Sequence, residues 1–230
     1  MIRRIMPLLV GVAFLGTPPS HSSHSSHSDI TGVWKIDYGH APNGRAYWGQ
    51  VTITRKGECY DIEWALNSGE KYHGVGMVLR ETILAVAWSN TPRESGYGVV
   101  FYADNDEGGF EGWWCQPDGT QGVENLEGPA TLAGTHQLAE GGNSGTGTVT
   151  MGRFKNSKLN YEMSWVTSLG SYDGFGTKLQ EDAEIIAGVW GISSGGGTAL
   201  YSLNKLDQGK MLGWWAAIGD TRQGEESLKR

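Results

Sequence analysis

Beyond its first residues the sequence has no long hydrophobic run, and it has fewer basic than acidic residues. A membrane-spanning helix needs roughly 20 consecutive apolar residues, so we expect no integral membrane insertion by the body of the chain. The formal net charge is −7 at pH 7, whereas proteins that bind nucleic acids cluster Lys and Arg against the phosphates. We therefore expect no nucleic-acid partner.

The sequence also has few groups that catalyse reactions or bind metals. Its two cysteines and the three histidines outside the N-terminal region, His40, His73 and His136, do not have the spacing of a zinc site. No helix is evident in the sequence, so it has no Gly-x-Ser-x-Gly elbow between a strand and a helix and no glycine-rich phosphate loop that opens a helix. We predict no metal, no cofactor and no enzymatic activity.

Glycine and aromatic residues, by contrast, are abundant. The chain has 36 Gly, 10 Trp and 9 Tyr among 230 residues, and glycine stands at about twice its usual share of roughly 7%. Each glycine in a helix interior costs about 1 kcal/mol relative to alanine, and so many aromatic residues argue against a disordered chain. The composition therefore indicates a soluble all-β protein with glycine-rich turns.

The first 28 residues have the pattern of a secretory signal peptide followed by a polar tail. Arg3 and Arg4 precede the apolar stretch 5–15, which is shorter than a membrane anchor requires. The tail HSSHSSHS at 21–28 is interpreted as a solvated linker with at most weak affinity for metal ions. We predict a secreted or periplasmic protein whose net charge becomes more negative once residues 1–28 are removed.

The rest of the chain repeats itself with a period of roughly 100 residues, which we interpret as an internal duplication. The predicted domains are a first repeat at 29–130 and a second repeat at 131–230. Their landmarks recur in the same order: YDIEW at 60–64 with YEMSW at 161–165, GWW at 112–114 and 213–215, and GVENL at 122–126 with GEESL at 224–228.

Each repeat is predicted to be an antiparallel meander of short strands. In the first repeat Tyr60, Ile62 and Trp64 alternate with Asp61 and Glu63, the pattern of a sheet with one buried and one solvated face. We predict strands near 31–38, 46–55, 58–66, 70–80, 83–89, 97–103, 109–116 and 122–127, and near 132–138, 145–154, 158–167, 171–179, 184–191, 197–203, 210–217 and 224–229.

The predicted core is aromatic, because aromatic residues recur on the apolar faces of these strands. Long meanders commonly close their edges by curling into barrels. We favour two small barrels, one from each repeat; one larger barrel or sandwich built from both repeats is the alternative, and an outer-membrane barrel is a third arrangement that the weak apolar alternation disfavours. The core residues are Trp34, Tyr60, Trp64, Trp88, Trp114, Tyr161, Trp165, Trp190 and Trp215.

Gly32-Val33-Trp34 at the first strand resembles the Gly-x-Trp start of calycin barrels, the group of lipocalin-like and avidin-like proteins. The resemblance implies a barrel whose tryptophan closes the floor beneath a ligand cavity. The second repeat has Gly134-Thr135-His136 at this place, which departs from the pattern.

A second resemblance covers residues from about 31 to 230. The pattern Tyr60-x-Ile62-x-Trp64, then Gly74-x-Gly76, Gly112-x-Trp114 and Gly122-x-Glu124, repeated from Tyr161-x-Met163-x-Trp165 onward, is similar to a family of secreted proteobacterial repeat proteins. Members are often labelled fibronectin-binding. The resemblance therefore implies an extracellular-matrix or cell-surface protein or glycan as partner.

Four residues are candidates for a binding site. Glu124 and Glu226 hold equivalent places, each on the same strand face as a leucine, so an inward carboxylate is either a ligand anchor or general acid, or a structural hydrogen-bond acceptor. Within each Trp-Trp pair, Trp113 and Trp214 point away from the core of their repeat. They are expected either to pack between the repeats or to form an external binding surface.

Cys59 and Cys115 form a possible disulfide in an oxidising compartment. Neither has a cysteine counterpart in the second repeat, where Asn160 and Ala216 stand. Placed in one barrel, the two cysteines are expected at opposite ends, beyond the roughly 7 Å between Cα atoms that a disulfide allows.

Two functions are compatible with the sequence. The first hypothesis is a non-enzymatic secreted or periplasmic binding module, adhesin-like by family resemblance. The alternative is a calycin-like carrier that holds a small apolar ligand inside a barrel.

Overall fold

The computed structural model describes residues 29–92, 95–105, 108–139, 145–203, 207 and 209–230. The predicted signal peptide and tail, residues 1–28, lie outside the described residues. Within the described part of the chain the regular structure consists of sixteen β-strands and one short 3₁₀ turn, η1 (Phe154–Asn156). The expected all-β class is confirmed.

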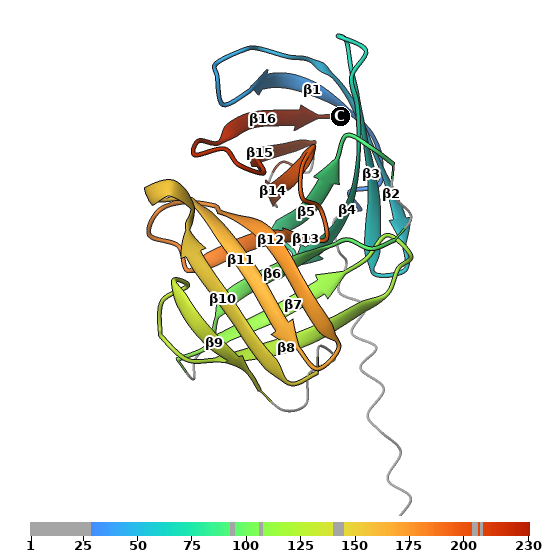
Figure 1. Ribbon diagram of the computed structural model, residues 1–230. Helices are drawn as coiled ribbons and strands as arrows, with labels where there is room; N and C mark the ends of the chain where they lie inside the picture. Colours follow the sequence, from blue (N-terminus) through green and yellow to red (C-terminus); the bar gives the residue numbers. More distant parts are fainter. Residues whose placement is uncertain (1–28, 93–94, 106–107, 140–144, 204–206, 208) are drawn as a thin grey trace, which may run out of the picture.

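The first of two closed barrels, barrel A, contains eight antiparallel strands in the order β1-β16-β15-β14-β5-β4-β3-β2. In Figure 1 it is the barrel that joins the blue and teal strands to the red ones. Its strands are β1 (Gly32–His40), β2 (Gly49–Lys56), β3 (Cys59–Leu66), β4 (Lys71–Leu79), β5 (Ile83–Ser89), β14 (Gly196–Leu203), β15 (Lys210–Ala217) and β16 (Gly224–Lys229).

Barrel B has the matching strand order, β10-β11-β12-β13-β6-β7-β8-β9, and is coloured from green to orange in Figure 1. Its strands are β6 (Gly98–Asp104), β7 (Phe110–Cys115), β8 (Gln121–Glu127), β9 (Gly134–Leu138), β10 (Gly147–Arg153), β11 (Asn160–Thr167), β12 (Gly170–Lys178) and β13 (Ile185–Trp190).

The two small barrels predicted from the repeats are therefore present, but the assignment of one barrel to each repeat was wrong. Each barrel takes five strands from one repeat and three from the other: β5 pairs with β14, and β13 pairs with β6. The boundary between residues 130 and 131 falls within barrel B. The repeats exchange their last three strands, and because β6 and β14 occupy equivalent places the exchange leaves both strand orders alike.

The exchange depends on glycine where the described residues of the two connections, 90–92 and 95–97 in one and 191–195 in the other, lie against each other. Gly96 and Gly191 both have positive φ, 78° and 77°, and a Cβ on Gly191 would collide with the carbonyl oxygen of Gly96. Asn90 N donates to Gly195 O at 2.7 Å and so ties the segments together. Only glycine fits this close approach of two backbones.

Buried side chains form three clusters. One fills barrel A around Trp34, Trp64 and Tyr201, and a second fills barrel B around Tyr102 and Trp165. The third lies between the barrels, because it joins outward-facing residues of strands from both. Its members include Met77, Ala85, Ala87, Val99, Phe101, Ala187, Val189 and Leu200.

Polar contacts at the edge of this inter-barrel cluster follow the duplication. Lys56 Nζ donates to Pro117 O, from barrel A to the β7–β8 turn of barrel B. The other barrel makes a contact of the same kind: Asn160 Nδ2 donates to Asp220 O at 2.9 Å, from barrel B to the β15–β16 turn of barrel A. The barrels are thus held together by two related sets of contacts in addition to the apolar cluster.

One end of each barrel is closed by a buried ring. In barrel A Trp34 is 1% exposed, donates from Nε1 to Ile30 O at 2.8 Å, and lies against the Arg230 guanidinium at 4.3 Å. In barrel B His136 takes this place, with Nε2 3.1 Å from Leu132 O. Since a carbonyl oxygen only accepts, Nε2 is the donor in this hydrogen bond.

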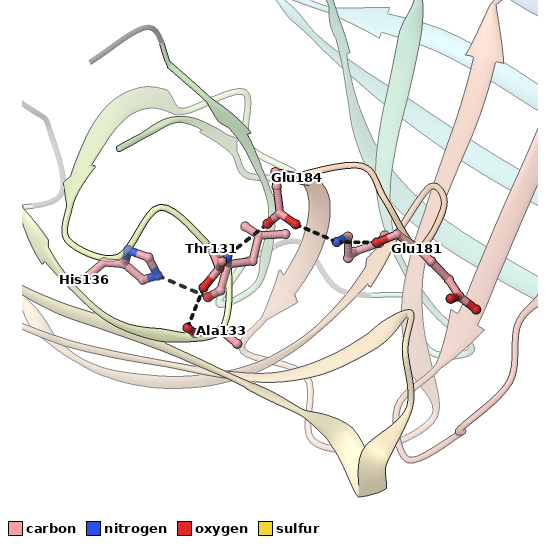
Figure 2. Close-up of polar contacts among 7 residues, drawn as sticks. Thr131, Ala133, His136, Glu181 and Glu184 are labelled. Atoms are coloured by element: carbon pink, nitrogen blue, oxygen red, sulfur yellow. Dashed lines mark hydrogen bonds and ion pairs between the residues drawn. The ribbon is translucent and has the colours of Figure 1, made fainter. Parts of the chain in front are cut away.

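The segment before His136 is held in place by a hydrogen bond to Glu184, which is itself part of an ion pair. Figure 2 shows His136 directed toward the backbone between Thr131 and Ala133, with Glu184 on the other side of that backbone. Glu184 accepts from Leu132 N at 3.0 Å and pairs at 3.1 Å with Lys178, which is 3% exposed. Nothing in the sequence pattern had singled out this buried lysine.

Asp29 and Arg230, the first and last described residues, also meet at the end of barrel A that Trp34 closes. Arg230 Nη2 donates to Asp29 O and to Thr31 O, each at 2.7 Å. Strands β1 and β16 are paired neighbours in the barrel, as β8 and β9 are in barrel B.

Candidate functional site

The end of barrel A opposite Trp34 contains a cavity of about 320 Å³. The loop from β1 to β2 and the turn from β3 to β4 form its rim, through Ala41, Arg45, Leu66 and Glu70. Six aromatic residues supply most of its wall and come from that loop and from β3, β4, β5, β14 and β15: Tyr47, Trp64, Tyr72, Trp88, Tyr201 and Trp215.

Four of these rings form a continuous series of aromatic contacts. Tyr72 and Trp88 lie with ring centroids 5.4 Å apart at 87°, and Trp88 and Trp215 lie 5.9 Å apart at 84°. Trp215 then meets Tyr47 at 6.2 Å and 68°. Edge-to-face pairs are mutually stabilising, so the rings hold one another in orientation around the cavity.

Glu226 lies at the base of the cavity and is 3% exposed. Its Oε1 accepts hydrogen bonds from Trp64 Nε1 at 3.1 Å and from the Tyr201 hydroxyl. Its Oε2 accepts from the Tyr47 hydroxyl at 2.9 Å, and that hydroxyl accepts in turn from Trp215 Nε1 at 2.8 Å. One carboxylate therefore orients four aromatic side chains.

Burial governs the protonation of this network. Burial raises the pKa of Glu226, and the hydrogen bonds from Tyr201, Trp64 and Tyr47 offset part of that rise. Burial and the neighbouring Glu226 also raise the pKa of Tyr47 and of Tyr201. Both phenols thus keep their protons and act as donors to the carboxylate.

The charges around the cavity are unequal. Among the described residues that line it, Arg45 alone is cationic, while Glu70 and Glu226 are acidic. Arg45 pairs with Glu70 at 3.1 Å on the rim, where the two side chains are 64% and 43% exposed. The buried Glu226 is therefore left without a cationic partner in the wall of its own cavity.

Barrel B contains a smaller version of the same site, with a cavity of about 140 Å³. There Glu124, 4% exposed, accepts from the Tyr102 hydroxyl, which accepts from Trp165 Nε1 at 2.8 Å. Gly145, two residues before its strand, stands where barrel A has Tyr47. Without that hydroxyl, Trp114 Nε1 is buried and has no hydrogen-bond partner among the described residues.

The four predicted binding residues lie in four different surroundings. Glu226 and Glu124 lie inside the cavities of barrels A and B respectively. Trp113 is half-buried and packs against the inter-barrel cluster. Trp214 is half-buried beside a groove that the β1–β2 loop forms with residues near η1.

The two cysteines occupy a place that the sequence argument did not foresee. Cys59 belongs to β3 of barrel A and Cys115 to β7 of barrel B, and both are buried free thiols of the inter-barrel cluster. Cys115 Sγ donates to Gly76 O at 3.5 Å and Cys59 Sγ donates to Gly119 O at 3.9 Å. The interaction between the two thiols lowers the pKa of Cys59 and, with burial, raises that of Cys115. The expected separation was wrong because it placed both strands in one barrel.

Tyr47, Arg45 and Tyr72 were not predicted as site residues. Tyr201 had a repeat counterpart, Tyr102, but only its aromatic character was visible in the sequence. Tyr47 has none, since Gly145 replaces it, so a search for duplicated residues could not identify it. A search for differences between the repeats would have found it.

No family model, curated protein or solved structure matches this chain. The described residues include no helix with the length and apolar character required to cross a membrane. They also include no group of three or more His, Cys, Asp or Glu residues arranged to hold a metal ion.

Proposed function

We propose that this chain is a non-enzymatic carrier whose barrel A holds one small molecule with a largely apolar or aromatic body. The observation that supports the proposal most strongly is the cavity of about 320 Å³ with its aromatic wall and a buried carboxylate at its base. Ligand sites are concave, mostly apolar and supplied with a few convergent polar groups, and they commonly measure roughly 300–1,000 Å³.

The difference between the barrels supports a single site. The cavity of barrel B, about 140 Å³, lies below that usual range. We therefore expect one ligand per chain, bound in barrel A.

The neutral fluorescent probe N-phenyl-1-naphthylamine tests the proposal. Trp88→Ala removes a wall of the barrel A cavity and should weaken probe binding by about tenfold, since a buried aromatic contact is commonly worth 1–2 kcal/mol or more. The matched control is Trp190→Ala, the equivalent change in barrel B, which should leave the affinity within about twofold. Absence of probe binding, or equal losses in the two variants, would contradict the proposal.

Native mass spectrometry of the chain purified from its own host provides a second test. A bound small molecule, released on unfolding and lost in Trp88→Ala, is the expected result. We further propose a secreted or periplasmic location, on the strength of the signal-like pattern of residues 1–28.

A second candidate function is adhesion to a matrix or surface protein or glycan. Trp48, beside the mouth of barrel A, is 58% exposed, and exposed tryptophans are frequent anchors of protein interfaces. Retention on immobilised fibronectin that disappears in Trp48→Ala, with probe binding in barrel A unchanged, would favour this function. Lack of retention by the unmodified chain would remove fibronectin as the partner.

A further inference from the structure

We infer that the ligand of barrel A carries a protonated amine, which binds the Glu226 carboxylate while its apolar part lies among the surrounding aromatic rings. This inference rests on the proposed carrier function and specifies its ligand class. It is drawn from three features of the cavity: an acceptor with unused capacity, an unbalanced buried charge, and aromatic faces that attract cations.

The first feature is that Glu226 can accept more hydrogen bonds than the protein supplies. A carboxylate has about four lone-pair sites. Oε1 receives two donors, Trp64 Nε1 and the Tyr201 hydroxyl, whereas Oε2 receives one, the Tyr47 hydroxyl. Glu226 lines the cavity, so an N–H group of a ligand is the natural second donor to Oε2.

The charge imbalance favours a cation over a neutral donor. All three donors to Glu226 are neutral phenol or indole groups, and the one cation of the cavity wall, Arg45, pairs with Glu70 on the rim. Taking an unpaired carboxylate out of water is costly, and the cost falls when a cation binds beside it. Burial raises the pKa of Glu226, which reflects the same cost.

The aromatic wall provides the rest of the recognition. Ammonium groups are attracted to the faces of Trp and Tyr rings within about 6 Å. The edge-to-face contacts of Trp88 with Tyr72 and with Trp215 fix these rings at nearly perpendicular angles. A ring whose edge meets its neighbour still presents a face elsewhere, and the cavity contacts all three rings.

Tryptamine and its neutral isostere tryptophol test the inference because they differ only in amine against hydroxyl. Each is titrated as a competitor of N-phenyl-1-naphthylamine at neutral pH, where the amine is charged. We expect tryptamine to bind at least about tenfold more tightly than tryptophol, since charge-assisted hydrogen bonds are roughly twice as strong as neutral ones.

Glu226→Gln should reduce this preference to about twofold, because it removes the charge that pairs with the amine. Glu124→Gln, the same change in barrel B, should leave the preference as it is. The comparison in the unmodified chain does not depend on whether Glu226→Gln folds. The amine inference would be overturned if tryptamine bound no more tightly than tryptophol, or if neither competitor bound. Continued binding of the fluorescent probe would then leave the carrier proposal standing.

Discussion

At the scale of single residues, the molecule is defined by one buried glutamate in each barrel and by the aromatic donors around it. Glu226 and Glu124 each accept from a tyrosine hydroxyl, Tyr201 and Tyr102. The sequence predicted both glutamates as equivalent inward carboxylates. It could not predict which donors they have, because these come from strands that are distant in sequence and, for Tyr47, from a loop without a counterpart.

The raised pKa of Glu226 predicts a pH effect on stability. A group whose pKa is higher in the folded than in the unfolded state stabilises the fold below its unfolded pKa, and that stabilisation is lost as pH rises through the folded pKa. The unmodified chain should therefore lose stability relative to Glu226→Gln between about pH 4 and neutrality. Urea unfolding of both proteins across this range measures the difference between their free energies of unfolding. The contributions of the other titrating groups are the same in both proteins and cancel in this difference. A difference that does not vary with pH would contradict the prediction.

Tyr47→Phe should destabilise barrel A, because it removes a donor to Glu226 and the acceptor of Trp215 Nε1. Leaving a buried polar group unpaired costs about 1–3 kcal/mol. Chemical unfolding measures the loss. Tyr172→Phe is the control, since Tyr172 is 40% exposed and its change should have little effect; equal losses would show that the Tyr47 hydroxyl contributes nothing specific.

At the scale of elements, the sequence predicted the strands well and their partners less well. Alternation and turn residues placed all sixteen strands close to their observed positions, for example 58–66 against Cys59–Leu66. They could not show that β5 pairs with β14 instead of β6. Both strands present a similar apolar pattern to the same neighbours, so only the path of the connecting segments distinguishes the two arrangements.

Gly191→Ala should be strongly destabilising, because it adds a methyl group where the backbone of Gly96 passes. A non-glycine residue at positive φ costs about 1–2 kcal/mol, and the steric collision adds to that. Gly57→Ala is the matched control: Gly57 has φ 65° and open space around its Cα, so only the conformational cost applies. Thermal unfolding that ranks the two variants equally would show that the crossing of the segments is not tightly packed.

At the scale of the whole molecule, the exchange of strands between the repeats makes the two barrels interdependent. Removing one repeat takes away part of both barrels, and the inter-barrel cluster joins outward faces of each. Trp34→Ala, a change in barrel A alone, should therefore lower the unfolding midpoint of the whole chain. Circular dichroism and tryptophan fluorescence should give one coincident transition, whereas two separate transitions would show independent barrels.

The thiols of Cys59 and Cys115 should form a disulfide between the barrels when the chain is treated with oxidised glutathione. A link closing a loop of this length is expected to stabilise the fold by about 4 kcal/mol. Thiol titration of the denatured chain before and after oxidation counts the cysteines, and unfolding in each state measures the gain. Cys59→Ala is the control, and two titratable thiols after oxidation would contradict the prediction.

The contact between Arg230 and Asp29 has a consequence for how the gene can be rearranged. These residues meet in barrel A where barrel B has the continuous connection from β8 to β9. A short linker from Arg230 to Asp29, combined with new termini between residues 130 and 131, would give a circular permutant in which the repeats trade their order. Since every strand would keep its neighbours, that permutant should fold into the same pair of barrels with the same ligand preference.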